Sequence, residues 1–274
     1  MGAGNLEYIC LRLARRFLLR GWIMNRFGRR LPYCQPSLGE TSPLAIVDLY
    51  WKYCRLADLD PVGKLILEIG SGSTNSTAYE ILGRGGDCVA YDPYVALDRR
   101  KDEEVFAAQI AERHPTLNRE KASRISDLND LPESSIDLVL SHSVLEHIKD
   151  IDQLLLDLSP VLKAEACMLH IVDYRDHFFK YPFHFLQFSS STWYSYLDPG
   201  DLSRARIGDH LHAFSRHGFH VEVLARAKDA RALLSMRGRI HRDFLEHSWE
   251  DLATTWGVLF ARRCRSNDRR DPDG

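Results

Sequence analysis

The sequence predicts an α/β protein built on a doubly wound, mostly parallel sheet. From residue 64 onward, short apolar runs alternate with segments of helical periodicity, which is the pattern of a parallel sheet with helices on both faces. The first apolar run also ends in glycines and leads into a helix, as a strand does when it enters a tight turn. The expected strands are 64–69, 88–91, 136–141 and 166–172, and the expected helices are 77–82, 103–113 and 151–162.

The last third of the chain predicts the edge of this sheet. A helix over 209–217 is followed by strands over 220–225 and 255–262, and a polar helical stretch over 229–245 separates these two strands. Two late strands separated by an insertion are typical of a sheet edge with one antiparallel member.

Composition supports a globular domain and excludes some partners. The chain has 274 residues, of which 45% are hydrophobic, and this length suits one α/β domain with additions. Its net charge of −2 predicts no general attraction to nucleic acid. None of the six cysteines form a CxxC pair, so the expected state is reduced thiols in a cytoplasmic protein.

The N-terminal region predicts a helical cap over 1–58, which precedes a main domain over 59–265 and a disordered tail over 266–274. Residues 5–30 show amphipathic periodicity and are rich in arginine. Two interpretations stay open: a peripheral helix that contacts an anionic membrane, or a cap that packs on the domain with its arginines in solvent. A second helix is expected over 43–57.

The strongest local signal is the glycine turn after the first strand, Gly70-Ser71-Gly72. Glycines allow a sharp turn and let a ligand approach the backbone. Glu68 stands two residues before the first glycine, where an acid suits a cationic ligand group better than a pyrophosphate. A third glycine is replaced by Thr74, which with Asn75 offers a hydroxyl and an amide to a ligand carboxylate.

Asp92 ends the second strand, about 20 residues after the glycines. An acid at this place can accept both hydroxyls of a ribose. The other interpretation is that Asp92-Pro93 only starts a turn. Its spacing from Gly70 favours the ribose ligand.

A third element completes a family resemblance. Ile125-Ser126-Asp127-Leu128, together with the stretch from Asp137 to Ile148, resembles the class I S-adenosylmethionine-dependent methyltransferases. The resemblance covers about residues 60–175 and, more weakly, 205–263. It implies a Rossmann-like, seven-stranded sheet and S-adenosyl-L-methionine as the cofactor, with Asp127 and Leu128 at the adenine. The implied cofactor-binding residues are Glu68, Gly70, Ser71, Gly72, Thr74, Asn75, Asp92, Asp127, Leu128 and Ser141.

Residues that follow the fourth and fifth strands are the candidates for chemistry. Methyl transfer is a direct displacement, so the protein mainly aligns the acceptor, and a base helps when that acceptor is a hydroxyl or an ammonium. The expected catalytic residues are His142, Asp173 and His177, with Asp176 as a further polar neighbour.

A metal ion is not expected. Glu146-His147 resembles a pair that joins acidic residues at a metal in quinone O-methyltransferases, but Ser143 stands where one of those acids would be. Ligands drawn from Asp173, His177 and His184 remain the alternative metal set. The prediction is therefore a metal-independent enzyme.

An aromatic segment over 178–197 lies in an insertion, 176–205, after the fifth strand. It predicts either a lid over the acceptor or a satellite hydrophobic cluster, and both can hold together.

The run from His170 to His177 with this segment resembles methyltransferases of polysaccharide and natural-product biosynthesis, which implies a small-molecule or glycan-like acceptor and no nucleic acid. Two alternatives remain: a membrane-associated enzyme with a lipid-linked acceptor, and a non-catalytic domain that binds the cofactor beside a partner.

Overall fold

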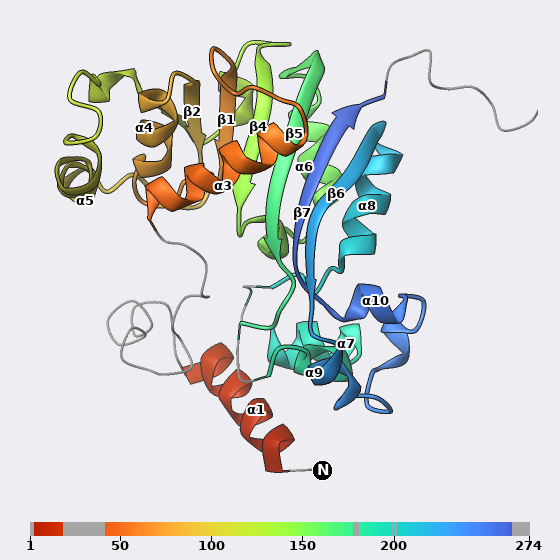
Figure 1. The fold of residues 1–274 in the computed structure, drawn as a ribbon. Coiled ribbons are helices and arrows are strands. Elements are labelled where there is room, and N and C mark those ends of the chain that lie inside the picture. The colour runs from red at the N-terminus through yellow and green to blue at the C-terminus, as the bar shows by residue number, and fades with distance from the viewer. Residues whose placement is uncertain (1–2, 19–41, 178–180, 199, 201, 265–274) are drawn as a thin grey trace, which may run out of the picture.

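The computed structural model describes residues 3–18, 42–177, 181–198, 200 and 202–264. A seven-stranded sheet with the order β3-β2-β1-β4-β5-β7-β6 forms its centre (Figure 1). Strand β7 runs antiparallel to β5 and β6, and the other pairs are parallel, which confirms the predicted fold class. The strands are β1 (Leu65–Ile69), β2 (Asp87–Tyr91), β3 (Ser123–Ile125), β4 (Ile136–His142), β5 (Leu162–Asp173), β6 (Phe219–Lys228) and β7 (Thr254–Arg263).

Helices and short helical turns surround this sheet. The α-helices are α1 (Ala3–Leu13), α3 (Pro43–Leu56), α4 (Ser76–Gly83), α5 (Arg99–Val105), α6 (Ile151–Leu158), α7 (Ser190–Thr192), α8 (Ile207–Arg216), α9 (Ala230–Leu234) and α10 (Trp249–Leu252). The shorter turns are η1 (Ala14–Leu18), η3 (Phe106–Ile110), η4 (Arg119–Lys121), η5 (Leu128–Asp130), η6 (Leu145–His147), η7 (His184–Gln187), η8 (Trp193–Leu197) and η9 (Arg242–Phe244).

The two faces of the sheet bury separate clusters because successive residues of a strand point to opposite faces. In β1, Leu67 packs in the cluster covered by α6 and α8, whereas Ile66 packs in the cluster covered by α3 and α4. Both faces are therefore apolar, which explains why the central strands appear in the sequence as continuous apolar runs.

Two expected elements differ from the structure, and one observed strand was not expected. Helix α6 ends at Leu158 rather than 162, because a proline at 160 disfavours helix in the residue before it and the backbone of 160–161 pairs with the turn before β4. The stretch 229–245 is helical only in α9 and η9, and Gly238 between them adopts a φ of +82°. Strand β3 is three partly exposed residues, too short to show a pattern.

A third apolar cluster lies below the carboxyl ends of the strands and contains the aromatic segment (Figure 1). Tyr181, Phe183, Phe185 and Trp193 are buried in it, and Tyr8 of α1 joins them. The segment therefore forms a satellite cluster, as one of the two interpretations expects. The aromatic residues at 178 and 179 lie outside the described residues.

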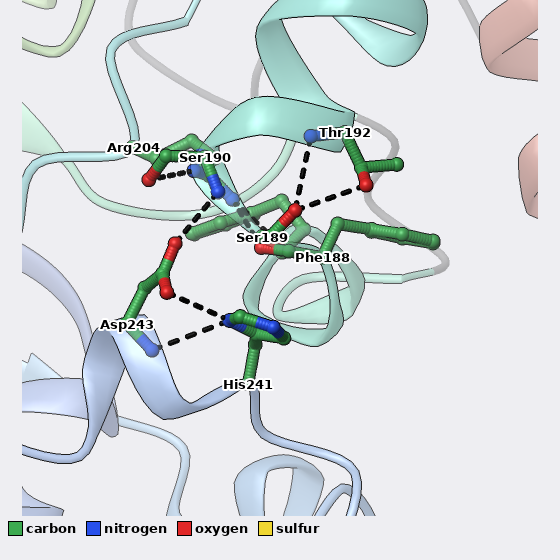
Figure 2. Close-up of polar contacts among 8 residues, drawn as sticks. Phe188, Ser189, Ser190, Thr192, Arg204, His241 and Asp243 are labelled. Carbon is green, nitrogen blue, oxygen red and sulfur yellow. Dashed lines mark hydrogen bonds and ion pairs between the residues drawn. The ribbon is translucent and has the colours of Figure 1, made fainter.

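Polar contacts tie the aromatic segment to the insertion between β6 and β7 (Figure 2). The backbone amide of Ser190 donates to Asp243 (2.7 Å), whose carboxylate also pairs with His241 (3.0 Å). Arg204 donates to the carbonyl of Phe188 (2.8 Å) and to the hydroxyl of Ser190 (3.0 Å). The Ser190–Asp243 bond joins two insertions that are about 50 residues apart in the chain, whereas the Arg204 bonds hold the aromatic segment together.

Helix α1 packs with an arginine inward, contrary to the expectation of arginines in solvent. Arg12 is 0% exposed, pairs with Asp176 and lies 4.6 Å from the Trp193 ring. Tyr8 donates a hydrogen bond to the same carboxylate. The N-terminal helix is thus joined to the turn that follows β5; residues 19–30 of the expected helix lie outside the described residues.

Candidate functional site

The glycine turn after β1 has a backbone that requires glycine. Gly70 and Gly72 have φ values of +80° and +66°, a region that other residues rarely adopt. A side chain at Gly70 would also collide with Val144, which follows β4. The turn therefore brings bare backbone to the carboxyl edge of the sheet.

Asp92 fixes this turn from the end of β2. One carboxylate oxygen accepts a hydrogen bond from the amide of Gly72 (2.9 Å), and the other accepts from the amides of Tyr94 (3.0 Å) and Val95 (2.9 Å). The Asp92 side chain thus stabilises a local turn, as the alternative interpretation expected. Each carboxylate oxygen has more than one acceptor site, so this role leaves room for a ribose hydroxyl.

Glu68 is buried behind the glycine turn. Burial raises its pKa to about 7, against a hydrogen bond from Thr77 and the charge of Arg124, which both lower it. Its Oε2 has no hydrogen-bond partner among the described residues. A buried carboxyl oxygen without a partner is costly. The residues at this place therefore fit a cationic ligand group such as the ammonium of a methionine moiety.

Arg124 of β3 is a residue that the sequence did not single out. Its guanidinium donates to the Ser71 hydroxyl (2.9 Å) and the Asn75 amide oxygen (3.2 Å), and to the carbonyls of Gly72 (2.6 Å) and Val95 (2.7 Å). It thus clamps the glycine turn to the loop after β2. A lone arginine in a three-residue strand carries no signal in one sequence.

Four other expected cofactor residues have partners within the protein. The Thr74 hydroxyl donates to Ser76 (3.1 Å), and Asp127 accepts from Asn129 at the start of η5 (2.9 Å). Leu128 is buried in the core. The Ser141 hydroxyl forms a hydrogen bond with Nδ1 of His170 (2.7 Å) beneath α8. None of the four line the cavity described next, so their contact with a cofactor stays a prediction.

A cavity of about 740 Å³ opens at the carboxyl edge between β1, β2 and the loop after β4. This volume lies within the range of small-molecule pockets in proteins. Gly70 and Asp92 line one side, and His147, Lys149 and Asp150 line the other. The glycine turn and the residues that follow β4 therefore meet in one space.

Two histidines and a buried acid lie together, and one of them, His147, lines the far side of this cavity. The rings of His147 and His177 are 5.0 Å apart, and ligand atoms of these two residues and Glu146 lie within 4.8 Å of one another. Burial raises the pKa of Glu146 to about 8. This cluster could hold a metal ion or move a proton. The sequence analysis singled out each of these three residues, but it did not predict that they lie in one cluster.

The other expected catalytic residues are placed differently. Both carboxylate oxygens of Asp173 accept hydrogen bonds from the Arg175 guanidinium (2.9 and 2.7 Å). Asp176 is buried in its ion pair with Arg12, so it stabilises the cap and is not a free polar neighbour of the acceptor. His142 is the last residue of β4 and is half-buried. Of the expected catalytic residues, His177 is related to the cavity through its ring contact with His147, which lines the cavity wall.

Comparison with known proteins identifies the domain. Residues 67–169 match a family model described as a methyltransferase domain. No curated protein sequence matches the chain.

Solved structures share the fold. Phosphoethanolamine N-methyltransferase 2 of Haemonchus contortus, in complex with phosphomonomethylethanolamine and S-adenosylhomocysteine, is 18% identical with a TM-score of 0.51. The match covers 92% of this chain but only 60% of that enzyme. A Galdieria sulphuraria protein described as a sarcosine dimethylglycine methyltransferase is 13% identical, with a TM-score of 0.51 and coverage of 79% of this chain and 84% of that protein.

Proposed function

We propose that this chain is an S-adenosylmethionine-dependent methyltransferase of the class I type, and that its acceptor is a small molecule or a glycan-like compound. The observation that carries the proposal is that the cavity of about 740 Å³ reaches both the glycine turn and His147. A methyl donor and an acceptor must share one space for a direct displacement.

The proposed cofactor site uses the residues around the glycine turn. Glu68 would take the ammonium group of the methionine moiety and Asp92 the ribose, with Asp127 and Leu128 at the adenine. The unpartnered oxygen of Glu68 and the position of Asp92 in the cavity wall support this assignment. The bound cofactor supplies the methyl group and its own leaving group.

The proposed acceptor site lies beside His147 and His177. An imidazole titrates near neutral pH, so His177 can accept a proton from an acceptor hydroxyl or ammonium group. Both carboxylate oxygens of Asp173 accept hydrogen bonds from Arg175, so we favour His177 rather than Asp173 as the base. We further propose that the aromatic segment covers this acceptor, in addition to forming its own cluster.

An isotope-transfer assay tests the function. The full chain is incubated with S-adenosylmethionine labelled at the methyl group and with separate pools of phosphoethanolamine, sarcosine, free sugars and lipid-linked sugars. We expect labelled product in one pool. Cofactor binding by calorimetry without label transfer to any pool would support a non-catalytic cofactor-binding domain instead.

A lipid-linked acceptor is the second candidate function. The observation that favours it is the exposure of Leu6 and Phe17 in the N-terminal helical segment, whose Arg16 lines a smaller cavity that shares Lys149 with the larger one. No helix among the described residues is long and apolar enough to cross a membrane.

A further inference from the structure

Glu146 is a buried acid whose charge the surrounding protein does not match. It lies in η6, is 3% exposed, and neither of its carboxyl oxygens has a hydrogen-bond partner among the described residues. Burial and the nearby charge of Asp173 raise its pKa, and weaker contacts with Ser143 and the local backbone offset only part of that rise. A buried carboxyl group in this state is costly, so its position favours a cationic partner.

Two imidazoles approach this carboxyl group from different segments of the chain. His147 follows it directly in η6, and His177 lies in the turn after β5. One ligand atom from each of the three residues lies within 4.8 Å of the other two, and no other group of three histidine, cysteine or acidic residues in the described chain is as close. Asp176, the neighbour of His177, is held by its ion pair with Arg12 and by a backbone hydrogen bond to Pro182 (2.8 Å). The fold therefore brings three potential metal ligands together from two loops.

Two imidazole nitrogens and one carboxylate oxygen form a donor set suited to zinc. Zinc binds such atoms at about 2.0–2.2 Å, and a site with three protein ligands leaves the fourth position to water or another ligand. Ligand atoms of a tetrahedral site stand about 3.4 Å apart. The cluster must therefore close slightly around the ion, which rotation of the exposed His147 side chain can supply. Magnesium and calcium prefer sites made of oxygen atoms, whereas imidazole suits zinc.

The cluster can be reached from solvent through the reaction cavity. His147 is exposed and lines the cavity of about 740 Å³, whereas Glu146 lies behind it in the protein interior. An ion that enters the cavity therefore meets an accessible imidazole first and the buried carboxylate second.

We propose that Glu146, His147 and His177 bind a zinc ion, and that this ion inhibits methyl transfer. The ion would give the Glu146 carboxylate the positive charge that its surroundings lack. As a zinc ligand, His177 uses the lone pair of one ring nitrogen for the metal while its other nitrogen carries hydrogen, so it can no longer accept a proton from the acceptor. The ion takes no part in the transfer itself, so turnover does not require metal. Inhibition rests on the proposed function, whereas zinc binding does not.

Competition between the metal-free full chain and a chromophoric chelator for Zn²⁺ tests the binding. We expect one zinc ion per chain, which magnesium does not displace. Glu146→Gln should weaken the affinity at least about 100-fold, because even outer partners of metal ligands contribute about 10–100-fold. His147→Ala, at an exposed side chain, should show a similar loss and replaces Glu146→Gln if that variant does not fold by circular dichroism. His212→Ala, at an exposed histidine of α8, is the matched control and should bind zinc as the parent does.

Methyl-transfer assays with added Zn²⁺ test the inhibition. We expect turnover of the parent chain to fall over the zinc concentrations at which the ion binds, and EDTA to restore it. The zinc site would be overturned by the lack of one-to-one binding, by affinity that survives both substitutions in the cluster, or by an equal loss in His212→Ala. Turnover that saturating zinc leaves unchanged or raises would overturn the inhibition. A chain that binds zinc through these residues but transfers no methyl group would contradict the proposed function and leave the zinc site standing.

Discussion

The proposed cofactor end and the proposed acceptor end of the cavity are built in different ways. At the cofactor end, Asp92 and Gly72 lie 20 residues apart and are joined by hydrogen bonds to backbone groups. At the acceptor end, Asp176 depends on Tyr8 and Arg12, which are more than 160 residues away in the sequence. The first arrangement follows from a local motif, and the second requires the N-terminal helix. The acceptor end should therefore fail first when a single distant contact is removed.

The largest expected effect is the loss of stability when the ion pair between Arg12 and Asp176 is broken. Arg12→Met leaves the carboxylate of Asp176 buried without its cation, which should lower the free energy of unfolding by about 3–5 kcal/mol. Urea denaturation followed by tryptophan fluorescence measures this loss. The double variant with Asp176→Asn should recover much of it, since no charge is then left unpaired. A loss below about 1 kcal/mol in Arg12→Met would mean that α1 is dispensable for the acceptor end.

The next effect separates chemistry from cofactor binding. If His177 is the base, His177→Ala should lower the rate of methyl transfer by about 10²-fold and leave the affinity for S-adenosylmethionine unchanged. His142→Ala serves as the parallel test of the other candidate. Full turnover in both variants with the true acceptor would show that neither imidazole removes a proton.

The cofactor end is tested at Asp92. Asp92→Ala should weaken the binding of S-adenosylmethionine by about 1–3 kcal/mol, because the amide of Gly72 loses its acceptor and the ribose loses its proposed ligand. Isothermal calorimetry measures the change, with exposed Asp130→Ala as the control. Unchanged affinity in Asp92→Ala would remove this residue from the site.

Acid should weaken the face of the sheet covered by α8. Burial lowers the pKa of His170 to about 3, so the folded state takes up this proton less readily than the unfolded state, in which the value is about 6.5. The free energy of unfolding therefore has its full value above pH 6.5, and it falls as the pH drops from 6.5 toward 3. At pH 5 the loss from His170 should be about 2 kcal/mol. Urea denaturation at pH 7 and 5 should show this loss reduced in His170→Gln and intact in exposed His212→Gln.

The smallest expected effect is that of chelation. Although Glu146, His147 and His177 lie close enough to bind an ion, Ser143 supplies no carboxylate to them. Turnover should therefore persist in EDTA. Activity that is lost in EDTA and restored by a divalent ion would make these three residues the leading ligands.

The same contrast explains what could be predicted from the sequence. The sheet and the glycine turn depend on apolar runs and on residues close together in the chain, so their pattern is visible. Arg12 could not be predicted to be buried, because its partner Asp176 and the Trp193 ring belong to a distant segment. Arg124 was missed for a related reason: its four acceptors lie in loops that only the folded sheet brings to β3.

The clamp made by Arg124 also bears on the thermodynamics of ligand binding. Four hydrogen bonds from one guanidinium hold the glycine turn against the loop after β2. A ligand that enters there meets a backbone whose shape is already set, so little conformational entropy is lost on association. Replacing Arg124 would leave the glycine motif intact in the sequence, but the backbone of the glycine turn would become more mobile.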